Sequence, residues 1–581
     1  MSNRIPLNFI WSYLSKSKVK LTFICISLFL SVGFKLIATF LFGKSFDNFI
    51  DTRDLDNLIK ILLVIATFFL LSSAFGWYQY YNMNDIGAKA TSKIKSDLFY
   101  KVESLSLDFF EKTNSKDLLI NFTKDISNIE KLLSNGILKF IYNSIQLIGI
   151  LILMFILDVR LSLITLGLTL IIYIIVKSTS KRVSAIDKCR KDKYERLNDF
   201  IENDLLNLKI IKAYGLEKEK ILTFHQLNKG LKDISIKSTY LLEISTPLLK
   251  GIYNISLVIL AVSGGISVIK GTSSIGIFIE FIILSRLFFQ SMKQLYLFNK
   301  DYNESLESTK EIIKLINEKI SINDNENSKD IKAINGSIDF NNVSFKGSKN
   351  IDPIKAIHLS VQKGEKVVLV GSTDSGKSTI LNLINRFYDT TTGEIKIDGN
   401  NIRNIKLSSL RSKVVMVPKE TTLFTGTIKD NILYGKLDST DEEVESACRQ
   451  AGIHDYISTL TEGYDTEIIS TTSLFTEEQE KLISIARTIL SKPDIVLMEE
   501  GYPSTNIVTQ IKIHEAIKNL TAGKTSFIIA HNIKTLKSAD KILVMKNGEI
   551  VEEGKHEELI NHQGLYEKIF NNQFSNTKNI C

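Results

Sequence analysis

The sequence predicts an all-α transmembrane domain of six helices, followed by an α/β domain built around a phosphate-binding loop (P-loop). Two observations carry this prediction. Nearly all long apolar runs lie before Met292, and residues 371–378 match the pattern G-x-x-x-x-G-K-[S/T] at every fixed position. The chain has 581 residues, which is too long for one domain of ordinary size. We therefore expect three parts: a transmembrane domain at 1–319, a linker at 320–336 and a phosphate-loop domain at 337–581.

Six stretches of the first part are long enough, or nearly so, to cross a bilayer, which takes about 20 residues. They lie at 21–42, 58–80, 138–157, 161–176, 248–269 and 275–289. The last stretch is short and contains Glu280 and Arg286. Charge in the bilayer is costly, so we expect these two side chains to line a cavity or meet a partner. The segments 82–136 and 177–243 carry Lys, Glu and Asp at helical spacing, which predicts helices that continue well beyond the membrane.

Charge in the loops predicts the orientation of the membrane domain. Basic residues precede the first span, whereas the loop at 44–60 is rich in aspartate, so we expect this loop outside the cell. The prediction is a multi-pass protein of the cell (plasma) membrane with residues 337–581 in the cytoplasm. The net charge of +8 fits basic cytoplasmic loops better than nucleic-acid binding. The four cysteines form no C-x-x-C pair, which argues against a zinc site or a disulfide framework.

The phosphate-loop domain is expected to have short strands alternating with helices, which is typical of an α/β core. Strands are predicted at 337–345 and 357–361. Asp398-Gly399 and Asn547-Gly548 each separate two apolar stretches, as tight hairpin turns do.

The phosphate loop has the layout that its chemistry needs. An apolar strand at 367–370 precedes it and a helix at 379–384 follows it. Gly371 and Gly376 allow the backbone to wrap closely, so that the loop N–H groups and the helix N-terminus face an anion. Lys377 is then expected to reach the β- and γ-phosphates of a nucleotide, and the Ser378 hydroxyl to hold Mg²⁺.

A membrane half followed by this loop resembles an ATP-binding cassette (ABC) exporter of the half-transporter type, with one membrane domain fused to one nucleotide-binding domain. The resemblance covers nearly the whole chain. The stretches 106–135 and 210–217 resemble the intracellular loops that touch nucleotide-binding domains in this family. The resemblance implies ATP and Mg²⁺ as cofactors, and membrane lipid and a second half-transporter as partners. Peptides, lipids and amphiphilic drugs are all candidate substrates.

In this family two nucleotide-binding domains close on two ATP molecules. Each ATP lies between the phosphate loop of one chain and the signature segment of the other. The resemblance therefore assigns ATP binding to the loop and the first helical residues after it: Gly371, Ser372, Thr373, Asp374, Ser375, Gly376, Lys377, Ser378 and Thr379.

The resemblance also assigns roles around the bound nucleotide. Glu500 follows an apolar strand and falls where the family places the general base for the attacking water. His531 matches the switch histidine that reads the γ-phosphate. Glu499 stands where an aspartate normally supports Mg²⁺, and it is one methylene longer. Ser378 and Glu499 are therefore the implied metal ligands.

Three positions depart from the family pattern. Gly347 replaces the expected adenine-stacking aromatic, and the loss of one stack costs about 1–3 kcal/mol of binding. Lys419 stands at the position of the Q-loop glutamine, and a lysine cannot accept a hydrogen bond. Asn506 replaces the aspartate that usually follows the Walker B strand.

The largest departure lies in the signature segment. The family pattern L-S-G-G-Q falls on Phe475, Thr476, Glu477, Glu478 and Gln479. Two carboxylates thus stand where glycines normally approach the ATP of the partner. A charge pair at 4 Å is worth about 4 kcal/mol at an effective dielectric of 20, and against a triphosphate the sign is repulsive. We expect Thr476 to cap a helix with acids in its first turn, and this degenerate segment to do nothing more.

This uneven set of motifs favours a heterodimer. A homodimer would present the altered signature to both ATP sites, whereas a second half-transporter would supply an intact signature to the phosphate loop of this chain. The alternative is a membrane sensor or gate that binds nucleotide without hydrolysing it, a reading supported by Gly347, Lys419 and Glu499.

Overall fold

The computed structural model describes residues 4–50, 55–113, 115–243, 245–325, 328–331, 333–347, 351–469, 475–500, 507–530 and 532–574. Its internal contacts separate two units. The first, here called the helical unit, comprises Met1–Val102 and Leu118–Asn317. The second, the α/β unit, comprises Glu103–Asp117 and Glu318–Cys581.

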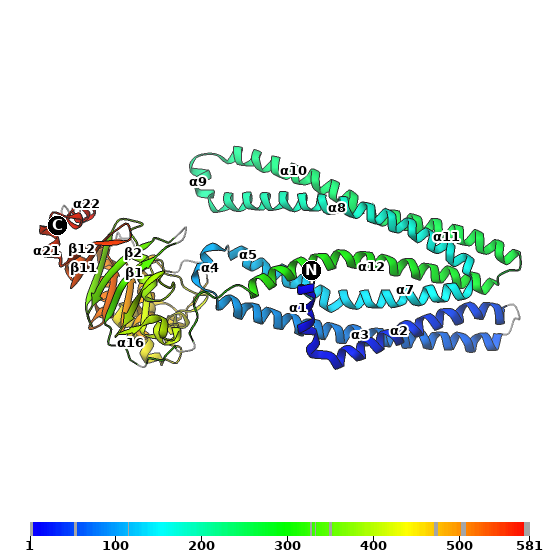
Figure 1. Ribbon diagram of the computed structural model, residues 1–581, viewed down its shortest axis with the longest axis horizontal. Helices are drawn as coiled ribbons and strands as arrows, with labels where there is room; N and C mark the ends of the chain where they lie inside the picture. The colour runs from blue at the N-terminus through cyan, green and yellow to red at the C-terminus, as the bar shows by residue number, and fades with distance from the viewer. Residues whose placement is uncertain are drawn as a thin grey trace. The chain divides into compact units, whose positions relative to one another are not determined.

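The helical unit consists of long helices joined by short turns (Figure 1). Helix α12 packs against α2, α7 and α11, while α8 packs against α10 and α11. The helices are α1 (Arg4–Leu14), α2 (Lys18–Ser45), α3 (Leu55–Glu103), α5 (Ser115–Ile120), α6 (Ile126–Lys131), α7 (Ile137–Leu157), α8 (Val159–Leu206), α9 (Leu208–Ala213), α10 (Glu217–Glu243), α11 (Ser245–Ile269) and α12 (Ile275–Ile316). A π-helical turn, η2 (Phe46–Ile50), follows α2.

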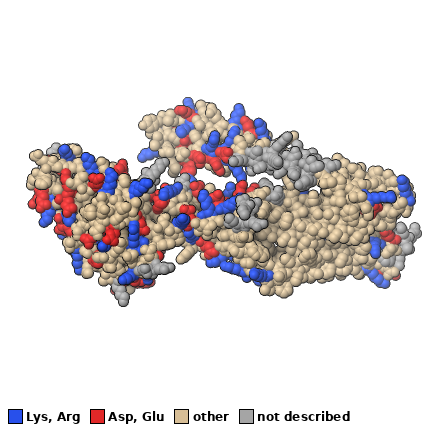
Figure 2. Space-filling model, viewed as in Figure 1, with Lys and Arg blue, Asp and Glu red and all other residues tan. Residues whose placement is uncertain are grey.

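Several of these helices are suited to a membrane. Among the described residues, four stretches are long and apolar enough to cross one: Pro6–Asn48, Asp56–Glu103, Lys116–Leu157 and Ile275–Ile316. Two shorter apolar stretches, Val159–Leu170 and Tyr253–Ile269, overlap two other predicted spans, 161–176 and 248–269. On the face shown in Figure 2, mostly uncharged residues cover the middle of this unit. The predicted helical membrane domain is confirmed, while the count of six spans stays a prediction.

Two helices extend well beyond a bilayer. Helix α3 has 49 residues and α8 has 48. At 1.5 Å per residue each is about 70 Å long, more than twice the thickness of a hydrocarbon core of about 30 Å. This confirms the helical extensions that the charged segments predict.

Small polar residues hold α2 against α3. Ser31 Oγ donates to the carbonyl of Ser72 at 2.9 Å, and Ser72 Oγ donates to the carbonyl of Ser31 at 2.8 Å. Both residues are buried. Small hydroxyl residues let two membrane helices approach closely and bond across the contact, which explains why serines stand inside apolar runs.

The α/β unit contains two main sheets (Figure 1). The larger has the order β12-β11-β3-β10-β9-β6 and is parallel except for β12 at its edge. The smaller is antiparallel with the order β2-β1-β4-β5. The strands are β1 (Ile338–Phe345), β2 (Ile354–Val361), β3 (Lys366–Gly371), β4 (Thr392–Ile397), β5 (Asn400–Asn401), β6 (Val414–Val417), β7 (Gly426–Thr427), β8 (Glu467–Ile468), β9 (Ile495–Glu499), β10 (Thr525–Ile529), β11 (Lys541–Lys546) and β12 (Glu549–Gly554).

Helices accompany these strands, as an α/β core requires. They are α4 (Leu107–Lys112), α13 (Lys377–Ile384), α14 (Leu407–Lys413), α15 (Ile428–Leu433), α16 (Asp441–Ala451), α17 (His454–Thr459), α18 (Glu477–Leu490), α19 (Ile507–Thr521), α20 (Ile533–Lys537), α21 (His556–Asn561) and α22 (Leu565–Phe574). Strand β3 is apolar on both faces because both are covered. Val368 and Val370 join a core with α16, α18 and α19, whereas Val367 and Leu369 join a core with α13 and the smaller sheet.

The two predicted hairpin turns are present. Asp398 and Gly399 connect β4 to β5 with φ of 48° and 75°, and Asn547 and Gly548 connect β11 to β12 with φ of 50° and 84°. Positive φ at both central residues is what a two-residue hairpin of type I′ needs, and Asp-Gly and Asn-Gly adopt it readily.

The parallel strands bring distant residues to one edge. β10 pairs with both β3 and β9, so Gly371, Glu499 and Ile529 end neighbouring strands at the same side of the sheet. Ligands of open α/β sheets bind at this carboxyl edge.

The short helix α4 belongs to the α/β unit, although α3 and α5 flank it in the chain. Tyr388 Oη donates to Glu111 Oε1 at 2.7 Å, and the rings of Phe345 and Tyr388 lie 5.6 Å apart. Burial, together with this bond to Glu111, raises the pKa of Tyr388 above its usual value. Helix α4, which is part of the stretch 106–135 that resembles an intracellular loop, thus packs within the α/β unit.

Candidate nucleotide site

The phosphate loop joins β3 to α13 in a conformation that needs glycine. Gly376 caps α13 with a φ of 94°. A Cβ on Gly371 would collide with the carbonyl of Met545 and would lie 2.7 Å from Ser375 Oγ. Both glycines therefore keep the loop narrow, so that its N–H groups can surround a phosphate.

The Lys377 side chain folds over this loop. Its Nζ donates to the carbonyls of Gly371 and Ser372 at 2.9 and 2.5 Å, and to Ser375 Oγ at 3.0 Å. Burial lowers the pKa of Lys377, while three nearby carboxylates oppose the shift. The positive charge is thus held at the centre of the loop, where a phosphate would lie.

The two predicted metal ligands are in contact. Ser378 Oγ, in the first turn of α13, donates to Glu499 Oε1 at the end of β9. The extra methylene of Glu499 does not prevent it from reaching the phosphate loop. A hydroxyl and a carboxylate oxygen together are donors of the kind that Mg²⁺ accepts, so these residues fit that ion.

Glu500 lies beside them in an ordered, buried setting. It is 7% exposed, and its N–H donates to the carbonyl of Ile529 at 3.1 Å. Thr535 Oγ1, from α20, donates to Glu500 Oε1 at 2.5 Å. Sequence reasoning missed Thr535. Its signal is a hydroxyl residue in the first turn of the helix that follows β10, four positions after His531.

Other predicted positions lie elsewhere or are not described. Thr379 is buried, and its hydroxyl donates to the carbonyl of Asp352 at 3.1 Å, so this side chain does not point into the loop. His531 and Asn506 lie outside the described residues, as does the segment 470–474 that precedes the signature.

Lys481 is a second residue that sequence reasoning missed. It is 7% exposed in α18, and its Nζ donates to the carbonyls of Pro418, Lys419 and Glu499 at 2.5, 3.3 and 2.9 Å. Burial lowers the pKa of Lys481 to about 8, against the opposing effect of Glu499 and Glu500. The Lys481 ammonium thus links α18 to residues 418–419 and to the end of β9.

Replacing Lys481 with Met should lower the ATPase rate of the assembled transporter by about tenfold, because three carbonyls lose a shared donor and the end of β9 shifts. Titration with a fluorescent ATP analogue should show affinity changed less than about twofold, since the phosphate loop is untouched. Lys492→Met, on the exposed side of the same unit, is the control. An unchanged ATPase rate in Lys481→Met would contradict this role.

The signature segment forms a capped helix start. Thr476 precedes α18, its hydroxyl accepts from the N–H of Gln479 at 3.4 Å, and its own N–H donates to Gln479 Oε1 at 2.9 Å. Glu477, Glu478 and Glu480 occupy the first turn. The predicted cap is confirmed, and both the backbone N–H and the side chain of Gln479 take part in it. Phe475 is buried, with its ring 6.0 Å from that of Tyr456.

Replacing Thr476 with Ala should destabilise the α/β unit by about 1 kcal/mol, the usual value of an N-cap hydroxyl. For a domain of this size the midpoint of its unfolding transition should fall by about 2–4 °C in scanning calorimetry of the full chain. Thr476→Ser keeps the hydroxyl and should behave like the wild type. Equal midpoints for the Ala and Ser variants would show that the cap contributes nothing.

The turn at residue 347, where the sequence predicts the loss of an adenine-stacking aromatic, has a backbone that needs glycine. Gly347 has a φ of 73°, and a Cβ there would collide with the carbonyl of Ile351. The turn therefore excludes an aromatic side chain at this position. The nearest aromatic residue before it, Phe345, packs on Tyr388 instead.

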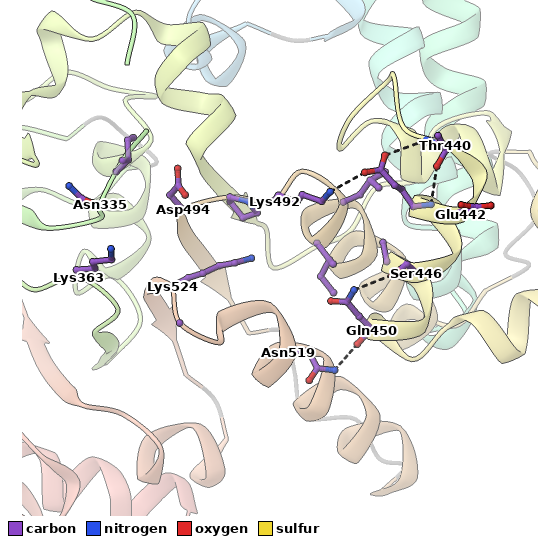
Figure 3. A pocket seen from close by; sticks show the side chains of 17 residues that line it. Asn335, Lys363, Thr440, Glu442, Ser446, Gln450, Lys492, Asp494, Asn519 and Lys524 are labelled. Carbon is purple, nitrogen blue, oxygen red and sulfur yellow. Dashed lines mark hydrogen bonds and ion pairs between the residues drawn. The ribbon is translucent and has the colours of Figure 1, made fainter. Parts of the chain in front are cut away.

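A separate surface pocket of about 590 Å³ lies at the amino ends of the parallel strands (Figure 3). Asp494 and Lys524, which line it, immediately precede β9 and β10, and Lys363 lies shortly before β3. These positions mark the amino ends of the strands, whereas the phosphate loop follows a carboxyl end. The pocket is therefore distinct from the nucleotide site.

Comparison with known proteins agrees with this geometry. Residues 21–292 match the family model described as the ABC transporter transmembrane region, and residues 354–502 match the one described as "ABC transporter". The ABC transporter ATP-binding protein YfiC of Bacillus subtilis is 32% identical over 565 residues, covering 97% of this chain and 94% of its own length. The chain belongs to the ABC transporter family. This ABC transporter is a multi-pass membrane protein that carries its membrane and ATP-binding domains in one polypeptide, as the sequence predicts.

Other similar ABC transporters have more specific names. The ATP-dependent lipid A-core flippase of Syntrophus aciditrophicus is 30% identical over 540 residues, which cover 93% of this chain and 90% of the flippase. The putative multidrug export ATP-binding/permease protein YgaD of Bacillus subtilis is 29% identical over 509 residues, with 87% and 88% coverage.

Proposed function

We propose that this chain is one half of an ATP-driven exporter, and that it works as a heterodimer in which the second half supplies an intact signature segment. One observation supports this most. Lys377, Ser378, Glu499 and Glu500 are brought together at one edge of the sheet, while the signature segment is reduced to a capped helix start.

The residues of this site suit ATP hydrolysis. Lys377 holds the β- and γ-phosphates, and the glycines keep the N–H groups of the loop on them. Glu500 accepts a proton from the attacking water as its oxygen bonds to the γ-phosphorus and the bond to the bridging oxygen of ADP breaks. Thr535 positions the Glu500 carboxylate by donating to its Oε1 at 2.5 Å. Bound Mg²⁺, held by Ser378 and Glu499, would neutralise phosphate charge.

The second composite site is proposed to turn over little. There the partner supplies the phosphate loop, and this chain supplies Glu477 and Glu478 in the first turn of α18. Acids at a helix N-terminus are favourable for the helix itself, but they repel a triphosphate. The altered segment of this chain would therefore make the two ATP sites of the heterodimer unequal in turnover.

The transported substrate is proposed to be amphiphilic. Relatives named as a lipid flippase and as multidrug exporters support this class.

The test is Glu500→Gln in the assembled pair, because an amide keeps the shape of the carboxylate but cannot take the proton. ATP turnover should fall by about a hundredfold or more, while ATP still binds. The control is Glu462→Gln, an exposed acid in the same unit. Unchanged turnover in Glu500→Gln would favour the alternative, a nucleotide-binding sensor or gate without hydrolysis.

A further inference from the structure

A buried carboxyl group without a partner lies in the helical unit. Glu280, in the second turn of α12, is 1% exposed. Its Oε1 has no hydrogen-bond partner among the described residues. An isolated buried carboxylate is strongly unfavourable, so the group requires either a proton or a cation.

A second carboxylate lies next to it. Asp47, in η2, accepts from Ser274 Oγ at 2.6 Å and from the N–H of Gly276 at 2.7 Å, so donors already satisfy it. The two acids flank one close helix contact. A Cβ on Gly43 would collide with Glu280 Oε2, and a Cβ on Gly276 would lie 2.6 Å from Asp47 Oδ2.

The charge of Lys44 acts on Glu280, but no basic residue in the described part of the chain forms an ion pair with it. Lys44 Nζ lies 4.9 Å from the ring centre of Phe40, and Lys35 Nζ is 3.5 Å from Tyr142 Oη. Lys139 on α7, Lys250 on α11 and Arg286 on α12 are exposed. Within the described part of the chain, Glu280 and Asp47 take part in no ion pair. Arg286 is exposed, so its predicted place in a cavity stays a prediction, whereas Glu280 is enclosed.

We propose that Glu280 and Asp47 form a binding site for one small cationic group where α2 and α12 meet. The group is either a proton or the ammonium head of an amphiphilic substrate; the second source rests on the proposed export function. Oε1 of Glu280 provides the free acceptor, and Asp47 strengthens the negative potential. The glycines at the contact let the two helices close around the site.

The test uses the purified full-length protein in lipid nanodiscs and dicyclohexylcarbodiimide, an apolar reagent for protonated carboxyl groups. The carboxyl proton moves to a carbodiimide nitrogen as the carboxyl oxygen bonds to the central carbon, and rearrangement leaves an N-acylurea that peptide mass spectrometry detects. Glu280 should be labelled at least about tenfold more than exposed Glu304 on the same helix, and labelling should fall as pH rises. Glu280→Gln should remove the signal.

Two further arms separate the sources of charge. In Asp47→Asn the midpoint of the labelling curve should move to lower pH, because a neighbouring negative charge no longer favours the protonated form. A dodecyltrimethylammonium salt that protects Glu280, where uncharged dodecanol does not, identifies the ammonium source; no protection identifies the proton. Because labelling needs no ATP turnover, its result stands apart from that of the export test. Absent or pH-independent labelling of Glu280, or an unmoved midpoint in Asp47→Asn, would overturn the proposal.

Discussion

Replacing Lys377 with Ala should weaken ATP binding to the phosphate loop of this chain by about a hundredfold. The Nζ atom lies within hydrogen-bond distance of three oxygens of the loop, so its charge is already placed where a phosphate would lie. Charge-assisted bonds of this kind contribute about 1.5–3 kcal/mol each, and about 2.7 kcal/mol corresponds to a hundredfold change in affinity. Equilibrium binding of radiolabelled ATP to the purified chain measures the effect.

The control for Lys377→Ala is Lys363→Ala, which removes an exposed lysine shortly before β3. Both variants lower the net charge by one, so a long-range effect of charge would appear in each. Equal ATP affinity in the two variants would mean that Lys377 does not contact the nucleotide. The proposed ATP-driven export would then lose its structural basis.

Replacing Glu477 and Glu478 together with glycine should raise the ATPase rate of the chain purified alone by about tenfold or more. The change removes two carboxylates that repel a triphosphate, a cost of about 4 kcal/mol per charge pair at 4 Å and an effective dielectric of 20. It also removes the Cβ atoms that keep the helix N-terminus of one copy away from the ATP of another. Release of phosphate in proteoliposomes is the measurement.

A matched control exists within the same unit. Helix α16 has the same start as α18: Thr440 caps it in a capping box, and Asp441 and Glu442 stand in its first turn. The variant Asp441→Gly/Glu442→Gly likewise replaces two first-turn acids with glycine, at a similar helix cost of about 1 kcal/mol per glycine. If both double variants gained the same activity, repulsion at the signature would not explain the low rate.

Much of the fold was predictable because its signals are local. Apolar length predicts membrane helices, charged helical periodicity predicts their extensions, and Asp398-Gly399 and Asn547-Gly548 predict hairpins whose positive φ values the structure confirms. The capping box of Thr476 and Gln479 likewise depends on a segment of only four residues. Each of these features is determined by residues close together in the sequence, within one turn or one membrane span.

The features that escaped prediction depend on contacts between distant segments. Lys481 is an ordinary helical lysine in the sequence, and only the fold brings its Nζ to the carbonyls of Pro418 and Glu499. Thr535 meets Glu500 because β10 lies beside β9 in the sheet. Glu280 reads as a costly charge in a span, and its closeness to Asp47 follows from the packing of α12 against α2 and η2.

The most direct test of the account compares ATP turnover by this chain alone with turnover after reconstitution with a half-transporter that carries an intact signature. If the chain works as a heterodimer, we expect little turnover by the chain alone, a rise of about tenfold or more in the pair, and loss of that rise when Glu500→Gln is placed in this chain. If the chain alone turned over ATP as fast as the pair, Glu477 and Glu478 would not impair the site and the heterodimer would not be needed.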